Sequence, residues 1–140
     1  MAATPPPHYN SFTEARAHLK DLLDATAHDQ IGTVRRDNEL TVLVSGDRMR
    51  QLLRRSTPLK AEVHDEDGWW WAFIPDTPVS ADGATFEEAI TDLTDALREY
   101  AAAWDDHLGT APNHRQHWSV VQLIKLSDDA QLREWILGTP

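Results

Sequence analysis

The first apolar pattern along the chain has the period of a helix. Residues 11–14 read Ser-Phe-Thr-Glu, a capping box in which Ser11 would be the N-cap. Behind it, apolar side chains recur at i, i+4, i+7 and i+8, which is the spacing of one helical face. These side chains are Ala15, Leu19, Leu22 and Leu23. We expect this helix to end near His28.

The pattern then changes to short β-branched runs. Residues 31–35 and 40–44 are two such runs on either side of Arg36-Asp37-Asn38-Glu39, a turn composition, so they predict a hairpin. Ser45-Gly46-Asp47 opens a second predicted helix, whose apolar face carries Met49, Leu52 and Leu53. With a short strand at 8–10, these elements predict a helix–hairpin–helix module over residues 8–56.

A second predicted module, over residues 59–138, starts with strands. Residues 59–64 alternate between apolar and polar side chains, and residues 69–74 are aromatic and apolar. Asp65-Glu66-Asp67-Gly68 lies between them and has the composition of a hairpin turn. We expect a third short strand at 79–81.

The strongest helical pattern follows these strands. Thr85-Phe86-Glu87-Glu88 is a second capping box, and apolar side chains recur behind it at intervals of three and four residues, to about His107. They are Phe86, Ile90, Leu93, Leu97, Tyr100 and Trp104. We expect a loop at 109–117, a strand at 118–126 and a short last helix capped by residues 127–129. The predicted fold class is α+β, with the second module arranged as βββαβ plus a C-terminal helix.

Charge divides the chain in the same place as the pattern. The 140 residues carry a net charge of −10. Residues 1–57 hold eight Lys and Arg against seven Asp and Glu, whereas residues 58–140 hold five against sixteen. Clustered Arg side chains in the front can neutralise phosphates, and an acidic back favours a basic protein partner.

Composition also limits the chemistry and the location. The chain has no Cys, which excludes a disulfide scaffold, a thiolate metal site and a thiol nucleophile. The apolar runs are too short to span a membrane. The N-terminus lacks the basic and apolar regions of a signal peptide, so we expect a cytoplasmic protein.

Residues 8–55 resemble the Phd/YefM (prevent-host-death) antitoxin domain. The resemblance rests on Glu14-Ala15-Arg16, Leu22-Leu23, Val34-Arg35-Arg36 and Val42-Leu43-Val44-Ser45. It implies a dimeric module that binds operator DNA, and its DNA contacts would come from Arg16, Arg35 and Arg36. Arg suits this role because it makes bidentate contacts with phosphate or guanine.

Residues 59–126 are similar to the HicB antitoxin fold. The matching motifs are Gly68-Trp69-Trp70, Ile74-Pro75-Asp76, Gly83-Ala84-Thr85 and Glu88-Ala89. A typical member of that family ends in a separate DNA-binding domain. Only about a dozen residues follow the last predicted strand, so we expect the front module to supply DNA binding instead.

Together the two resemblances imply a composite type II antitoxin. It would neutralise a small basic ribonuclease, and we favour a toxin of the RelE/ParE type. A HicA-type ribonuclease and a Doc-type kinase are the alternative toxins. The antitoxin would also repress its own operon as a homodimer formed through the N-terminal module. The expected toxin-binding residues are Trp69, Trp70, Trp71, Glu66, Asp67, Asp128, Asp129 and Trp135. The residues leave open which face of the Trp strand is free, and whether Trp135 is a core or a contact residue.

Two other functions are weighed against this one. A DNA-binding regulator could use the Trp strand to sense an aromatic ligand. An enzyme is not expected, because the consecutive Asp65, Glu66 and Asp67 alternate between faces and cannot jointly hold a metal. His114 and His117 have a spacing that metal ligands use, with His107 nearby, but no acidic ligand has a telling spacing to them. We therefore expect no metal and no cofactor.

Overall fold

The structure is a computed structural model that describes residues 6–57 and 60–138. The chain forms two compact units, Met1–Met49 and Arg50–Pro140, and the division falls inside helix α3 (Gly46–Ser56). The sequence places the boundary later, after residue 56, because the apolar pattern of α3 reads as part of the front module. Residue 59, where the first strand of the second module is predicted to start, lies outside the described residues.

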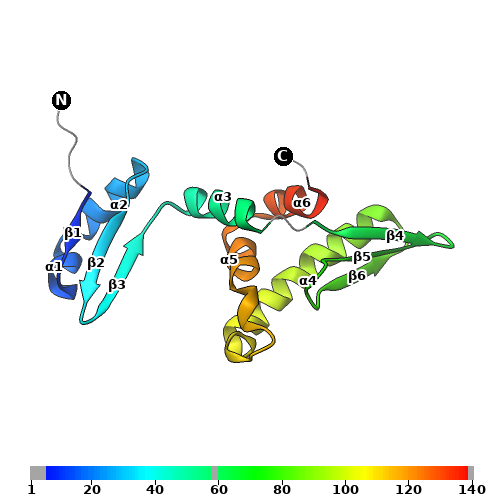
Figure 1. The fold of residues 1–140 in the computed structure, drawn as a ribbon. Coiled ribbons are helices and arrows are strands. Elements are labelled where there is room, and N and C mark those ends of the chain that lie inside the picture. Colours follow the sequence, from blue (N-terminus) through cyan, green and yellow to red (C-terminus); the bar gives the residue numbers. More distant parts are fainter. Residues whose placement is uncertain (1–5, 58–59, 139–140) are drawn as a thin grey trace. The chain divides into compact units, whose positions relative to one another are not determined.

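The first unit contains the predicted hairpin. Strands β2 (Gly32–Arg36) and β3 (Glu39–Leu43) are antiparallel, and β1 (His8–Tyr9) lies parallel to β2 at the other edge (Figure 1). Arg36 pairs with Glu39, which leaves a two-residue turn whose first residue, Asp37, has φ +54°. Two-residue hairpin turns favour positive φ, and Asp tolerates it, so this turn is a local consequence of the sequence.

The predicted first helix is interrupted at His18. The structure has α1 (Phe12–Ala17), capped by Ser11 as expected, and α2 (Leu19–Ala27). The prediction of one continuous apolar face is wrong: the buried side chains are Ala15, Leu22 and Ala25, whereas Leu19 and Leu23 are 50% and 53% exposed. The backbone of His18, at φ −120° and ψ 26°, leaves the helical region, so the spacing does not run on from α1 into α2.

After the end of α3, the second unit contains an antiparallel three-stranded sheet. It consists of β4 (Glu62–Glu66), β5 (Trp69–Phe73) and β6 (Ser80–Gly83), in that order. Helix α4 (Phe86–Asp106) is capped by the Thr85 side chain and packs along one face of this sheet (Figure 1). The third strand is predicted at 79–81 but extends to Gly83, where an added Cβ would lie 2.7 Å from the backbone nitrogen of Ala89. A glycine is therefore needed where β6 meets the start of α4.

The prediction of a strand at 118–126 is wrong, because this segment is helix α5 (Trp118–Leu126). Its four buried side chains are Val120, Val121, Leu123 and Ile124, and α5 packs against α4. Spacings of one, three and four residues belong to a helical face, but the β-branched run drew the prediction towards a strand. The expected loop before it contains two short 3₁₀ turns, Leu108–Thr110 and Arg115–His117.

The last helix is α6 (Asp129–Leu137). Asp128 and Gln131 form a capping box at its start, and Gly138 ends it with φ +70°. Its buried side chains are Leu132, Trp135 and Ile136. From β4 onward, the second unit is therefore βββα followed by two α-helices rather than βββαβ plus a helix, although the α+β class holds.

Candidate functional site

The Arg residues predicted to contact DNA are all exposed in the first unit. The Arg36 guanidinium carbon lies 5.6 Å from the centroid of the Phe12 ring. Arg16 stands four residues after Phe12 on α1, a spacing that places two side chains side by side on a helix. Arg36 thus lies over Phe12, and Arg16 stands one helical turn after Phe12 on α1.

Arg35 stands apart from this pair. It precedes Arg36 in β2, so its side chain leaves the opposite face of the strand, and it pairs across the hairpin with Leu40. Arg16 and Arg36 can approach one element of a ligand together, whereas Arg35 would reach it from the other side of the hairpin.

The three Trp residues of β5 divide between two environments. Trp70 meets Phe86 of α4 edge to face, with ring centroids 5.6 Å apart. Its neighbours on that face are Ala72 and Ile74, which are 1% and 0% exposed. Trp69 and Trp71, on the other face, are 45% and 47% exposed. The structure therefore answers the question the sequence left open: α4 covers the Trp70 face.

The two acidic residues predicted as contacts beside this strand, Glu66 and Asp67, lie in different elements. Glu66 pairs directly with Trp69 across the β4–β5 ladder. Asp67 has φ +52° in the hairpin turn, next to Gly68. Sequence reasoning missed Asp82 of β6, whose carboxylate accepts a 3.2 Å hydrogen bond from the Trp69 indole nitrogen. The register of a third strand was needed to find it, because Asp82 lies thirteen residues further along the chain.

The residues predicted on the last helix have structural roles. Trp135 is only 4% exposed, and its indole N–H donates to the Thr57 carbonyl oxygen at 3.0 Å. Trp135 is therefore a core residue of the second unit, and its contact with a toxin stays a prediction. The Asp128 carboxylate caps α6 by accepting from the Gln131 backbone N–H at 2.8 Å.

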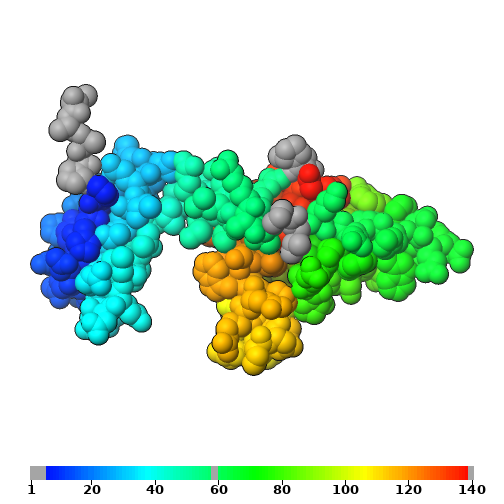
Figure 2. Space-filling model, viewed as in Figure 1, coloured from blue at the N-terminus to red at the C-terminus, as the bar shows by residue number. Residues whose placement is uncertain are grey.

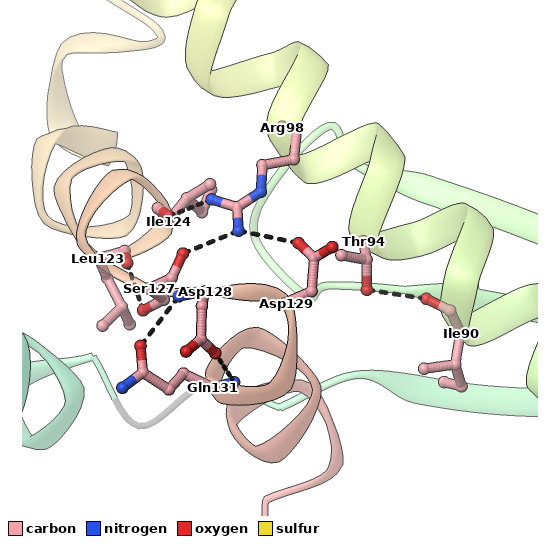
Figure 3. A network of polar contacts seen from close by, with 9 residues as sticks. All are labelled: Ile90, Thr94, Arg98, Leu123, Ile124, Ser127, Asp128, Asp129 and Gln131. Carbon is pink, nitrogen blue, oxygen red and sulfur yellow. Dashed lines mark hydrogen bonds and ion pairs between the residues drawn. The ribbon is translucent and has the colours of Figure 1, made fainter.

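Arg98 ties three helices of the second unit together (Figure 3). Its guanidinium donates to the carbonyl oxygens of Ile124 and Ser127, at 2.6 and 2.8 Å, and to the Asp129 carboxylate at 3.0 Å. The two carbonyls lie at the end of α5 and just after it, where backbone acceptors lack the usual helical partners. Asp129 is thus engaged by α4 while its side chain stays 83% exposed, and its contact with a toxin stays a prediction.

The His114–His117 pair surrounds Tyr100. The Tyr100 hydroxyl lies 2.9 Å from Nδ1 of His114 and 2.8 Å from Nδ1 of His117, and Nε2 of His117 lies 3.0 Å from the Asp76 carbonyl oxygen. A carbonyl only accepts, so Nε2 of a neutral His117 donates, and its Nδ1 accepts from the Tyr100 hydroxyl. The Tyr100 oxygen then accepts from His114. These nitrogens hold α4 to the segment before α5, and no group of three metal-ligating side chains occurs in the described residues.

Burial raises the pKa of Tyr100 above the ordinary value of 10.0, because the phenolate would lose solvation. The stability that the neutral phenol contributes is complete below pH 10 and is lost as the pH rises through the raised value. In a spectrophotometric titration at tyrosinate wavelengths, we expect a component above the ordinary pKa, absent from Tyr100→Phe. Persistence of that component in the variant would contradict the assignment, because Tyr9 is the chain's other tyrosine.

Comparison with known proteins identifies the family. A family described as antitoxin of toxin–antitoxin, RelE / RelB, TA system (PHD_like) matches residues 8–138. The chain belongs to this antitoxin family. A search of curated proteins gives no match. The match runs through both units of the antitoxin. The origin of its two halves in two different antitoxin families stays a prediction.

A solved structure shares the antitoxin's fold. It is the crystal structure of an antitoxin part of a putative toxin/antitoxin system from Syntrophomonas wolfei subsp. wolfei. The TM-score is 0.76 at 23% identity, over 91% of this chain and 94% of that chain. None of the antitoxin's described helices combines the length and the apolar character needed to cross a bilayer.

Proposed function

We propose that this antitoxin neutralises a small basic ribonuclease of the RelE/ParE type through its second unit, and represses its own operon by binding operator DNA through its first. The observation that carries the toxin type is the family match over residues 8–138, whose description names RelE / RelB. A HicA-type ribonuclease is the alternative partner, favoured by the HicB-like motifs of residues 59–126.

Charge supports the division of labour. Sixteen of the 23 acidic residues lie in residues 58–140. A ribonuclease that binds RNA has a cationic surface, and an acidic protein is steered to that surface and competes with RNA for it. The same negative field would repel DNA, so operator binding is expected to stay with the first unit, whose five Lys and Arg and seven Asp and Glu leave it far less negative.

The DNA contacts are proposed for Arg16, Arg35 and Arg36. All three are exposed; Arg36 lies over the Phe12 ring, and Arg16 follows Phe12 by four residues on α1. Arg guanidinium groups bind phosphate and guanine through two parallel hydrogen bonds, which positions as well as attracts. Removing one of them should weaken binding without touching the second unit.

A homodimer through the first unit is part of the proposal. Several large apolar side chains of this unit are about half exposed; they are Phe12, Leu19, Leu23, Ile31, Leu40 and Val42. A unit of about 50 residues buries little apolar surface alone, so a second copy offers these side chains a place out of water. Two-fold symmetry would also match a palindromic operator.

Growth rescue tests the toxin part of the proposal. The small basic protein encoded beside this gene would be expressed with and without the full chain. We expect the neighbour to arrest growth and the full chain to restore it, because the antitoxin occupies the toxin's RNA-binding surface.

A harmless neighbour, or an arrest that the full chain never relieves, would contradict neutralisation. The second reading would then take its place, a DNA-binding regulator with a ligand-sensing second unit. An inactive chain variant with an unfolded second unit serves as the control that rescue requires the folded protein.

A further inference from the structure

In the part of the second unit that the structure describes, α4 packs on one face of the sheet and the large side chains of the other face stay partly exposed. Trp69, Trp71 and Phe73 of β5 alternate onto this face, away from α4. Trp69 and Trp71 keep 45% and 47% of their surface exposed. The strands of this sheet are green in Figure 2, where the β4–β5 end of the second unit lies open to solvent.

Carboxylate side chains lie next to these aromatic rings on both strands that flank β5. Across the β4–β5 ladder, Glu62 pairs with Phe73 and Glu66 pairs with Trp69. On the β6 side, Asp82 pairs with Trp71 and accepts from the Trp69 indole. The side chains of these six residues form what we call the aromatic-acidic face.

The charge on this face has a single sign. The three strands read EVHDE, WWWAF and SADG, so they contain no Lys or Arg. His64, which pairs with Trp71, is the remaining titratable side chain of the face; it stacks on Phe73 at 5.8 Å and lies 3.9 Å from the Glu62 carboxylate. Within the described strands, the carboxylates therefore have no permanent cation among them.

This combination selects one kind of ligand. A guanidinium group is planar, stacks on indole rings and donates two parallel hydrogen bonds to a carboxylate. A lysine ammonium lacks the planar fork, and a nucleic acid would be repelled by the carboxylates. Trp and Arg are also the residues that dominate binding energy at the centre of protein interfaces.

We propose that the aromatic-acidic face is the surface on which an arginine-bearing segment of the toxin docks. This inference rests on the proposed function and makes it specific. The guanidinium groups would lie against Trp69 and Trp71 and bond to the carboxylates beside them. Trp70, on the covered face, would have no direct contact with the toxin.

The test measures the affinity of the purified full chain for the protein encoded beside its gene, by calorimetry. We expect Trp71→Ser and the double variant Glu62→Lys/Glu66→Lys each to weaken binding at least about 30-fold, the loss typical of a central interface residue. The matched control is Asp95→Lys/Glu99→Lys, which makes the same charge change at exposed positions of α4. Its affinity should stay within about threefold of the wild type.

The outcomes separate this inference from the function beneath it. If the wild-type chain does not bind its neighbour, the proposed function fails and this inference with it. If the wild type binds and the face variants bind equally well, the function stands but the toxin docks elsewhere. If the face variants lower the molecular mass of the free chain, the face is a contact between copies of this chain and the inference is overturned.

Circular dichroism and thermal unfolding of each variant check that it is folded like the wild type. The changed side chains are exposed, so the variants should retain the wild-type spectrum. A fall in affinity shared by the α4 control would mean that net charge alone attracts the partner, which would also overturn the docking assignment.

Discussion

Replacing Arg35 and Arg36 together by Ala is expected to weaken operator binding by about 30-fold or more. Each bidentate Arg contact contributes roughly 1–3 kcal/mol to DNA recognition, so two contacts account for at least this factor. If the contacts are to phosphates, the slope of log affinity against log salt should fall by about 0.9 for each one lost. Titration of the chain with DNA from upstream of its own gene, at several salt concentrations, measures both quantities.

The single variants separate contact from support. Arg36 lies over Phe12, so its removal also uncovers an aromatic ring that is already 57% exposed. The Arg35 side chain projects from the opposite face of β2, away from Phe12. Arg35→Ala therefore reports the loss of a DNA contact more directly than Arg36→Ala does. Wild-type affinity in Arg35→Ala combined with a loss in Arg36→Ala would place the interface on the Phe12 side alone.

The control for this experiment comes from the second unit. The double variant Arg115→Ala/Lys125→Ala also removes two positive charges, one from α5 and one from the turn before it. We expect it to bind operator DNA nearly as the wild type does. Growth rescue by Arg35→Ala/Arg36→Ala should remain intact, and its loss would refute the division of labour between the two units.

Trp135→Ala is expected to lower the free energy of unfolding by about 3–5 kcal/mol, the usual cost of removing a buried Trp side chain. The indole is 4% exposed, and its N–H bonds to the Thr57 carbonyl, which the variant would leave without that donor. Since small domains are stable by only about 5–15 kcal/mol, this loss threatens the fold itself. Urea unfolding followed by circular dichroism measures it.

Trp71→Ala is the matched control, because the same residue type is 47% exposed there. Its unfolding free energy should change by less than about 1 kcal/mol. If Trp135→Ala were as stable as the wild type but failed to neutralise the toxin, Trp135 would be a contact residue after all. Deletion of α6 cannot make this distinction, since it removes Leu132 and Ile136 from the core as well.

Local signals account for the elements that the sequence predicted well. Ser11, Thr85 and Asp128 cap helices where they were expected to, because a cap bonds to nitrogens three residues away and needs no distant partner. The hairpin turn at Asp37 and the long apolar face of α4 are equally local. Antitoxin membership was also readable, since its motifs are short runs of neighbouring residues.

The errors arose where neighbours in space decide the outcome. Residues 118–126 contain Val120, Val121 and Ile124, which are β-branched, but are helical, because the segment packs against α4 rather than into a sheet. The apolar pair Leu19 and Leu23 was predicted to be buried, but the break at His18 leaves it exposed.

The sequence by itself determined the nearly neutral front and the acidic back of the chain, the caps, the hairpin turns and the alternation of Trp69, Trp70 and Trp71. Each of these depends on residues close together in the chain. Only the tertiary structure decided which Trp face stays open, that Trp135 is in the core, and that Asp82 lies beside Trp69. These features depend on contacts between segments that are far apart in the sequence. The alternation of side chains along β5 does not distinguish the two faces of the sheet, and only the packing of α4 decides which face is covered.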